Sequence, residues 1–360
     1  MDGASKGRGK NRLRTASNAP VRLSDVATLA KVSAGTVSRV LSSPHLVSEE
    51  TTRVVRAAID KLGWVPHGAA RALASHRTRS VGAIIPNLAN PVFAQMIYAI
   101  QDALLGVGYT LVITCSEYDP AKALSGARAM IERGIDGLIL LGENFGDDFW
   151  HLLHVQKIPS LVTYSYRPHR DRHYVGFDNV RAARMAADHL LDLGHRDFLI
   201  LAQQVEGNDR AAQRLYGFSE AIRARGIALK PERIIQAPWS IVEGHQVMRE
   251  VIAAGDVPGA VLCSNDYLAM GALAACQACG ITTPGDVSIV GFDDLEIAAF
   301  LSPPLTTVRV PASEIGTRAA AIMVEHLERG APFQSVEMQA ELVVRASTAA
   351  PRRAASTAPR

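Results

Sequence analysis

A regular alternation of short apolar runs and longer amphipathic stretches, beginning near residue 80, constrains the fold of this 360-residue chain more than any other feature. A first series of predicted strands and helices occupies Val81–Ile85, Phe93–Leu105, Leu111–Thr114, Ala123–Arg133, Gly137–Leu141, Phe149–Val155 and Ser160–Thr163. A second series occupies Tyr174–Val175, Ala182–Leu193, Phe198–Leu201, Ala211–Arg225, Ile234–Gln236, Val242–Ala254, Ala260–Cys263, Leu268–Ala278 and Ser288–Val290. Apolar strands that alternate with helices form parallel sheets covered by helices on both faces. We therefore expect an α/β fold with two doubly wound parallel-sheet subdomains.

The position of a ligand follows from this architecture. In doubly wound folds, ligands bind beyond the carboxyl ends of the parallel strands. With two such subdomains of similar size, we expect those ends to face each other across a cleft.

The charge of the chain divides unevenly between its parts. The formal net charge of +3 combines residues 1–79, with 14 Lys/Arg and 5 Asp/Glu, and residues 80–349, with 21 Lys/Arg and 30 Asp/Glu. The last eleven residues add three arginines. A basic head on an acidic body indicates that only the head meets a polyanion. A basic tail without a partner is the alternative.

Composition excludes several classes of protein. A hydrophobic fraction of 48% with a small net charge excludes disorder throughout the chain. No apolar run approaches the roughly 18 residues that a membrane span needs, and the first ten residues lack the apolar core of a signal peptide. Four cysteines fit a reducing cytoplasm and no disulfide scaffold. We therefore expect a cytoplasmic, nucleoid-associated protein without membrane contact.

Three short helices are predicted within residues 21–66, between a disordered basic arm at 1–20 and a linker. Ser24, Ser33 and Ser48 are the expected N-caps, and Gly63 is the expected end of the third helix. The predicted apolar faces of the three helices comprise Val26, Ala27, Leu29 and Ala30; Val37, Val40 and Leu41; and Val54, Val55, Ala58, Ile59 and Leu62.

The first two of these helices read as a helix-turn-helix. The second helix carries Thr36, Ser38 and Arg39 on its polar side, and the small residues Ala34 and Gly35 at its tip. Small residues allow close approach to the major groove, hydroxyls bind phosphates or bases, and arginine binds guanine. Any small three-helix bundle shows similar apolar spacing, so the basic charge of the head is what favours DNA.

At these residues the chain resembles the lactose-repressor (LacI/GalR) family of transcriptional regulators. The matching motifs in the head are Val26-Ala27, Val32-Ser33, Thr36-Val37-Ser38-Arg39-Val40-Leu41, Val47-Ser48, Leu62-Gly63-Trp64-Val65-Pro66 and Ala70-Arg71-Ala72-Leu73. Those in the body are Asn90-Pro91, Asp136-Gly137, Asp188-His189-Leu190, Leu193-Gly194-His195-Arg196, Asn265-Asp266, Gly291-Phe292-Asp293-Asp294 and Pro304-Leu305-Thr306-Thr307-Val308. The resemblance covers about residues 22–346. It implies a periplasmic-binding-protein-like body and a homodimeric repressor, or occasionally an activator, whose affinity for operator DNA is set by a small effector.

The head departs from the family pattern at three positions. Lys31 stands where the family has glycine in the turn, which costs about 1 kcal/mol if the residue is left-handed. His67 replaces the asparagine that usually follows the proline, and Trp64 replaces a tyrosine. The resemblance and the groove chemistry together imply a DNA-binding set of Arg22, Ser33, Ala34, Gly35, Thr36, Ser38, Arg39, Ser48, Trp64, His67, Ala70 and Leu73.

Residues 67–79 form the predicted hinge. An isolated helix of eight residues, such as His67–Ala74, is not stable in water. The resemblance implies that it forms only when two copies pair in the minor groove, where Leu73 is wedged between base pairs. A plain flexible linker is the alternative.

No catalytic motif emerges from the sequence, so we expect neither an enzyme nor a bound cofactor or metal. The chain lacks the phosphate-binding Gly-x-x-x-x-Gly-Lys-Ser/Thr loop, the Gly-x-Ser-x-Gly elbow and the His-Glu-x-x-His metal motif. Cys276 and Cys279 have a metal-like spacing, but they lie in a predicted helix without a second pair. Buried apolar packing is the better interpretation of this pair.

The resemblance places an effector site at the strand ends. The candidate residues are Asn90, Phe93, Tyr164, Phe177, Arg210, Arg214, Trp239, Asn265 and Asp293. Carboxylates, amides and an aromatic face suit a sugar, and two arginines suit a sugar acid. Alternatives remain: Phe177 and Trp239 as core residues, Asn265 as the turn from strand to helix, and a surface salt bridge from Arg210 to Asp209 or Glu206. Many relatives have an acidic residue at the position of Tyr164, and Asn208-Asp209-Arg210-Ala211 is similar to gluconate-type repressors.

These observations predict a homodimeric transcriptional repressor that binds double-stranded operator DNA and is controlled by a carbohydrate or sugar acid. The expected effector-binding core spans 80–348, with an N-subdomain at about 80–177 and 309–337 and a C-subdomain at about 178–308 and 338–348, followed by a disordered tail at 349–360. A carbohydrate solute-binding protein is the alternative. A sugar-metabolising enzyme is a third class, which no constellation of residues supports.

Overall fold

The computed structural model describes residues 20–65, 77–167 and 172–352. The chain divides into two compact units, with the boundary in the sequence between Thr78 and Arg79. We call the described part of the first unit the head and that of the second unit the core.

The head contains α1 (Leu23–Ala30), α2 (Ala34–Ser42), the 3₁₀-helix η1 (Pro44–Leu46) and α3 (Glu49–Leu62). Ser33 and Ser48 cap α2 and α3, and Gly63 ends α3 with a φ of 58°, as predicted. The prediction of Ser24 as the first cap is wrong. The N-cap is Arg22, two residues earlier, so the helix starts at Leu23, and the Asp25 carboxylate accepts the Arg22 backbone N–H at 2.8 Å.

The core of the head is smaller than the apolar pattern predicted. Val26, Val37 and Val55 are completely buried, but Leu29, Leu41 and Val54 are exposed. Three short helices enclose only a narrow interior, so the flanks of each apolar face remain in solvent. Between α1 and α2, Lys31 adopts the left-handed conformation, with a φ of 56°, so this turn carries the strain expected when a residue with a side chain replaces glycine.

The core contains two six-stranded sheets. In the first sheet the strand order is β11-β5-β4-β3-β1-β2, and every pairing is parallel. Its strands are β1 (Ser80–Ile85), β2 (Thr110–Cys115), β3 (Gly137–Leu141), β4 (Ser160–Thr163), β5 (Tyr174–Gly176) and β11 (Val336–Glu337). Its helices are α5 (Pro91–Leu105), α6 (Pro120–Glu132), α7 (Asp147–Val155) and α12 (Ala312–Arg329).

In the second sheet the strand order is β12-β10-β9-β8-β6-β7, and only β12 is antiparallel to its neighbour. Its strands are β6 (Phe198–Gln203), β7 (Ile234–Ala237), β8 (Ala260–Cys263), β9 (Ser288–Asp293), β10 (Thr306–Arg309) and β12 (Glu341–Val343). Its helices are α8 (Asn179–Asp192), α9 (Asp209–Ala224), α10 (Ile241–Ala253) and α11 (Asp266–Ala278), with the 3₁₀-helices η2 (Pro231–Arg233) and η3 (Glu296–Phe300).

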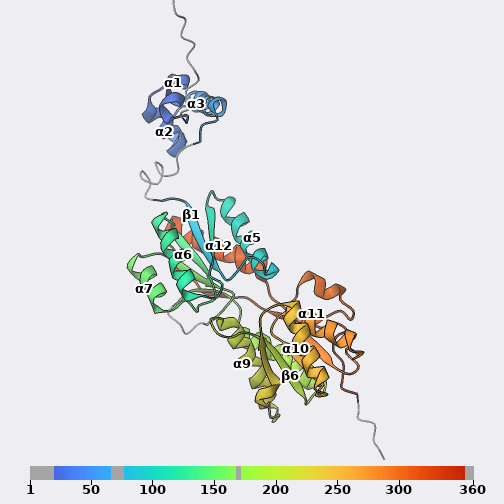
Figure 1. The fold of residues 1–360 in the computed structure, drawn as a ribbon. Coiled ribbons are helices and arrows are strands. Elements are labelled where there is room, and N and C mark those ends of the chain that lie inside the picture. Colours follow the sequence, from blue (N-terminus) through green and yellow to red (C-terminus); the bar gives the residue numbers. More distant parts are fainter. Residues whose placement is uncertain (1–19, 66–76, 168–171, 353–360) are drawn as a thin grey trace, which may run out of the picture. The chain divides into compact units, whose positions relative to one another are not determined.

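Both faces of each sheet are buried, which explains the continuous apolar runs of the strands. On the first sheet, alternate residues of β3 point to opposite faces. Leu138 and Leu140 join the cluster beneath α6 and α7, whereas Ile139 and Leu141 join the cluster beneath α5 and α12. Helices α5 and α12 lie side by side on that second face (Figure 1). The predicted α/β class with two parallel-sheet subdomains is confirmed.

The chain passes between the two sheets three times: after β5, after β10, and between β11 and β12. The prediction that Tyr174–Val175 opens the second series of strands is wrong, because β5 pairs with β4 in the first sheet. The proposed end of the N-subdomain at about residue 177 nevertheless lies after this short strand.

Candidate functional site

The polar side of α2 lies open on the surface of the head. Ala34, Gly35, Ser38 and Arg39 are exposed, and no hydrogen bond or ion pair joins the Arg39 side chain to another described residue. Ser33 accepts the Thr36 backbone N–H at 3.0 Å, and the two hydroxyls lie 2.9 Å apart. The tip of α2 is therefore capped from within and presents one unpaired arginine beside small and hydroxyl side chains.

The other predicted DNA-binding residues have mixed surroundings. Arg22 is exposed, and exposed Ser48 caps α3 by accepting the Thr51 backbone N–H at 3.3 Å. Trp64 is buried with the apolar residues of the head, at 9% exposure. His67, Ala70 and Leu73 lie outside the described residues, as does most of the predicted hinge.

In the core, side chains from both sheets converge on a narrow hollow with about 20 Å³ of free space, which we call the first hollow. Its lining comprises Asn90, Phe93, Tyr118, Gln203, Asn208, Arg210, Ala211, Arg214, Ser264 and Asp293. These residues follow the carboxyl ends of β1, β2, β6, β8 and β9, where a doubly wound fold binds its ligands. Five of the nine predicted effector residues belong to this lining: Asn90, Phe93, Arg210, Arg214 and Asp293.

Arg214 is the most extensively bonded side chain of the first hollow. Its Nε donates to Asn179 Oδ1 at 3.0 Å, and its Nη1 donates to the Ser264 carbonyl at 2.8 Å and to Asp293 Oδ1 at 3.3 Å. The guanidinium lies 3.7 Å from the centroid of the Phe292 ring. The cation–π contact and three hydrogen-bond partners hold this arginine in one orientation.

Asp293 ends β9 in a conformation with a φ of 111°, which is unusual for a residue with a side chain. Burial raises the pKa of its carboxyl to about 6, while the charge of Arg214 opposes that shift. Buried Asp266, which accepts the Thr307 hydroxyl and the Leu295 backbone N–H, has its pKa raised to about 8 by burial and then by Asp293. Two poorly solvated carboxyl groups, those of Asp266 and Asp293, therefore lie near the end of β9.

Arg210 lies one helical turn before Arg214 and joins the two halves of the core. Its Nη1 donates to the Leu141 carbonyl, at the end of β3, at 3.2 Å and to Asp209 Oδ1 at 3.0 Å. The predicted salt bridge to Asp209 is therefore present, but it is not on the surface, since the Arg210 side chain is only 5% exposed.

The remaining predicted effector residues lie outside the lining of the first hollow. Tyr164 packs edge-on against Phe93 and Phe177, with centroid distances of 5.8 and 5.3 Å, and both Tyr164 and Phe177 are buried. Trp239 packs edge-on against Tyr267. Asn265 caps α11 by accepting the Leu268 backbone N–H at 2.9 Å.

Five lining residues were missed by sequence reasoning. Gln203 and Ser264 stand at or directly after the ends of β6 and β8, so the rule of carboxyl strand ends could have found them. Asn208 and Ala211 begin α9, beside the predicted Arg210. Tyr118 lies in a loop with a φ of 63°, and no pattern in the sequence indicated it.

The described residues contain no group of three or more side chains that could hold a metal ion. Among the described helices, none is both long and apolar enough to span a bilayer.

A helix-turn-helix head joined to a two-sheet core with a polar hollow between the sheets defines the class of effector-regulated DNA-binding proteins. Residues 22–67 match the family described as bacterial regulatory proteins, lacI family, and residues 187–348 match the periplasmic binding protein-like domain. The chain is 30% identical over 327 residues to the HTH-type transcriptional repressor PurR of Pasteurella multocida, covering 90% of this chain and 98% of that protein. The protein belongs to the lacI family of bacterial regulatory proteins.

Solved structures agree with this assignment. The Lac repressor dimer bound to operator and an anti-inducer matches with a TM-score of 0.83 at 26% identity, over 92% of this chain and all of that one. The complex of the transcriptional regulator CelR with cellobiose matches with a TM-score of 0.67 at 27% identity, over 91% of this chain and 99% of that one. The protein is thus a DNA-binding repressor with an effector-binding core, and the alternative of a solute-binding protein finds no support.

Proposed function

We propose that this repressor acts as a homodimer on double-stranded operator DNA and that a carbohydrate or sugar acid in the first hollow controls its occupancy. The observation that carries this proposal is the convergence of Arg210, Arg214 and Asp293 with Asn90 and Phe93 in one hollow between the two sheets.

The chemistry of the first hollow suits a polyhydroxylated ligand. Asp293 accepts hydrogen bonds from hydroxyl groups, the amide of Asn90 both donates and accepts, and the Phe93 ring offers an apolar face to C–H groups. Arg210 and Arg214 are the donors for a carboxylate. CelR, a structural relative, binds the sugar cellobiose, which supports a ligand of this class.

The exposed polar side of α2 supports a DNA-reading role for the head. We assign base contacts to Arg39, Ser38 and Thr36, close approach to Ala34 and Gly35, and backbone positioning to Arg22, Ser33 and Ser48. His67, Ala70 and Leu73 keep their predicted minor-groove role, and Trp64 supports the head from within.

Dimer formation is supported by exposed apolar side chains on and beside α5. Tyr98, Leu105 and Leu88 are 73%, 68% and 50% exposed. Large exposed apolar groups in one region favour a protein interface, and the Lac repressor, a structural relative, is a dimer. The measurement is the molar mass in solution, which we expect to be twice the 38.6 kDa of the chain.

Two contacts between the halves of the core offer a route from effector to DNA. Arg210 donates to the Leu141 carbonyl, and Gln203 Nε2 donates to the Tyr118 hydroxyl at 3.2 Å. A ligand that replaces these contacts alters the closure of the N- and C-subdomains, a division supported by the three chain crossings. Coupling of a few kcal/mol is sufficient to switch occupancy. Such a repressor acts in the cytoplasm, at the nucleoid.

The test combines ligand screening with a matched pair of variants. We expect thermal-shift screening and calorimetry to identify a neutral sugar or a sugar acid that stabilises the core. Asp293→Ala should leave operator binding intact and abolish the response to that ligand. Asp294→Asn is the control, because the Asp294 carboxylate pairs with Arg309 and Arg345 and does not line the first hollow. An unchanged response in Asp293→Ala would refute the proposed site.

A further inference from the structure

The chain enters the core at Arg79, and this point is tied to two segments that are distant in the sequence. The Arg79 backbone N–H donates to Asp136 Oδ2 at 2.8 Å, and the Arg79 carbonyl accepts the Thr110 backbone N–H at 2.8 Å. The Ser80 carbonyl accepts the Asp136 backbone N–H at 2.8 Å. Ser80 and Thr110 begin β1 and β2, and Asp136 directly precedes β3. The entry of the chain is therefore fixed to the amino ends of three adjacent strands.

The side chain of Arg79 adds an attachment to helix α12. Its Nη2 donates to Glu328 Oε1 at 3.4 Å, and the same oxygen accepts the hydroxyl of buried Tyr109 at 2.8 Å. The Arg79 guanidinium lies 5.7 Å from the centroid of the Tyr109 ring. Arg79 has a φ of 54°, a left-handed conformation that a residue with a side chain keeps only where surrounding contacts impose it. We call Arg79, Asp136, Thr110 and Glu328 the entry cluster.

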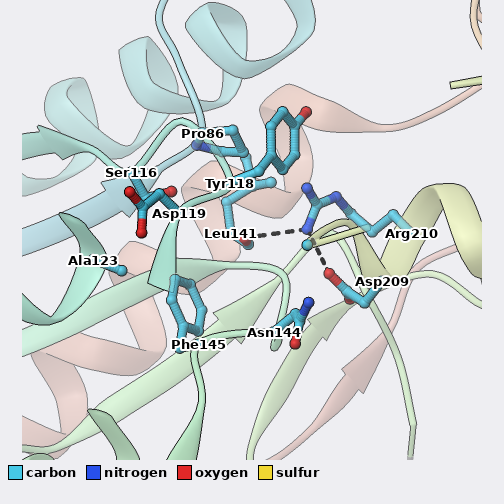
Figure 2. Close-up of a pocket in the computed structure, with 11 residues that line it drawn as sticks. Pro86, Ser116, Tyr118, Asp119, Ala123, Leu141, Asn144, Phe145, Asp209 and Arg210 are labelled. Atoms are coloured by element: carbon cyan, nitrogen blue, oxygen red, sulfur yellow. Dashed lines mark hydrogen bonds and ion pairs between the residues drawn. The ribbon is translucent and has the colours of Figure 1, made fainter. Parts of the chain in front are cut away.

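Strand β3 connects the entry cluster to the first hollow. Asp136 directly precedes this strand and Leu141 ends it, where the Leu141 carbonyl accepts Arg210 Nη1 at 3.2 Å (Figure 2). The strand pairs with β1 along one edge and with β4 along the other, and all of its residues are buried. A strand held in this way moves as one piece, because a packed interior does not deform continuously. A displacement at Leu141 would therefore reach Asp136.

We infer that Asp136 and Arg79 are positioning residues for repression, which pass the state of the Arg210–Leu141 contact through β3 to the point where the chain from the head enters the core. This inference rests on the part of the proposed function in which contacts between the halves of the core carry the effector signal. It adds the residues that receive that signal, and it does not depend on the chemical class of the effector.

The test is a double-mutant cycle across β3, measured without any effector. The probe is a DNA duplex selected by the parent protein from a random library, and fluorescence anisotropy gives its affinity for the full-length variants. Arg210→Met removes the contact to Leu141, as the effector is proposed to do. It should weaken DNA binding at least about fivefold, the lower end of allosteric couplings. We call this ratio of affinities the Arg210 response.

Asp136→Ala should abolish the Arg210 response. This substitution removes the acceptor of the Arg79 N–H, so that Arg210→Met added to it should change the affinity by less than about twofold. Two independent losses would instead multiply, since distant sites that do not communicate have additive free energies. Asp136→Asn keeps an oxygen for the Arg79 N–H and should retain the full Arg210 response, which distinguishes positioning from a general loss of stability.

The second sheet supplies a matched control, Asp197→Ala. Asp197 directly precedes β6, and its Oδ2 accepts the Gly259 backbone N–H at 3.3 Å. The arrangement resembles that of Asp136, but the chain from the head does not enter the core there. This variant should keep the Arg210 response.

Melting curves establish that each variant is folded. If Asp136→Ala does not fold, Arg79→Gly replaces it with the same expected loss, because glycine adopts the left-handed conformation and lacks the side chain that reaches Glu328. If Arg210→Met does not fold, Arg210→Lys replaces it, since lysine keeps a cation beside Asp209 and lacks the guanidinium N–H that binds Leu141.

The outcomes separate the inference from the proposed function. An Arg210 response that is as large with Asp136→Ala as without it would overturn the role of the entry cluster, while the proposed route from the effector stands. Loss of the response in Asp197→Ala as well would also overturn it, because the effect would then be a general loosening of the core. If Arg210→Met alone leaves DNA binding unchanged, the proposed route fails, and the inference fails with it.

Discussion

The head and the first hollow present their polar side chains in opposite ways. Arg39 of the head is exposed and unpaired among the described residues, whereas Arg214 of the core is buried and bonded to Asn179, Ser264 and Asp293. An exposed arginine keeps its hydration until DNA arrives, so its removal costs the folded chain little. A buried arginine donates hydrogen bonds to neighbouring buried groups, and its removal leaves those groups without partners.

This difference predicts where binding and stability separate. In the head, side chains that bind the partner are distinct from those that hold the helices together. In the core, the ligand-facing groups also stabilise the fold, so an effector must exchange internal hydrogen bonds for its own. Substitutions of binding residues should therefore lower DNA affinity without loss of stability in the head, and should lower the stability of the fold in the core.

The largest expected effect is that of Arg214→Met. The variant leaves Asp293, Asn179 Oδ1 and the Ser264 carbonyl buried without their donor, and breaking a buried pair in this way costs about 3–5 kcal/mol. The measurement is the free energy of unfolding of the core in a denaturant titration.

Arg223→Met is the matched control on the same helix. Arg223 is 55% exposed and pairs only with Glu220, at 3.6 Å, so its loss should change the free energy by less than about 1 kcal/mol. Equal effects of the two substitutions would contradict the comparison.

Arg39→Ala should have a smaller effect, and one confined to DNA binding. Loss of a bidentate contact to guanine costs about 1–3 kcal/mol, so operator affinity should fall by about 10- to 100-fold towards the non-specific level. The residual binding should remain sensitive to salt, because phosphate contacts persist. Binding-site selection followed by anisotropy at two salt concentrations measures both terms.

The unfolding of the Arg39→Ala variant should match that of the parent protein. Arg53→Ala is the control in the same head, since Arg53 is also exposed; it should preserve the selected sequence. If sequence preference survives the loss of Arg39, the assignment of α2 to the major groove is wrong.

Much of the core could be predicted from the sequence, because buried parallel strands leave a clear record. The strands Gly137–Leu141, Ser160–Thr163 and Ala260–Cys263 have the predicted bounds, since each is apolar on both faces and flanked by turn residues. The three-residue strand β5 was grouped with the second series of strands, although the predicted N-subdomain bounds of about 80–177 included it. Strand β5 pairs with β4, which is close in the sequence and equally apolar. The periodicity of apolar residues does not show which of several apolar strands pair with each other.

The candidate site was only half predictable, for a different physical reason. The family resemblance indicated Arg214, in α9, and Asp293, at the end of β9, and the structure brings them together. Asp209 was considered only in an alternative, as a possible surface partner of Arg210, because the sequence does not record that the glycine at 142 lets α9 approach the first sheet. Cys279 illustrates the reverse error: it was predicted to be buried with Cys276, but it ends α11 on the surface.

The smallest expected effect is a pH dependence that belongs to the core. The carboxyl pKa values of Asp266 and Asp293 are raised to about 8 and about 6, in both cases mainly by burial, whereas an unfolded chain has values near 3.9. The unfolded and folded pKa values therefore define a range from about pH 4 to about pH 8. Within this range the two carboxyl groups of the folded protein hold protons that the unfolded chain has released. The stability contributed by these groups is therefore complete below the unfolded pKa and is lost as the pH rises through the folded values.

The measurement is the melting temperature of the core at a series of pH values between about 5 and 8, where these shifted groups titrate. The contribution of the two carboxyls should fall as the pH rises, whereas His173, His189 and His195, whose pKa values are lowered mainly by burial, contribute in the opposite direction. Asp266→Asn removes the group with the higher pKa while keeping one oxygen for the Thr307 hydroxyl or the Leu295 N–H, so its curve should be flatter towards the upper end of the range. Parallel curves for the variant and the parent protein would show that Asp266 does not contribute to the pH dependence, and a parent melting temperature that rises relative to that of the variant as the pH rises would contradict the sign of the effect.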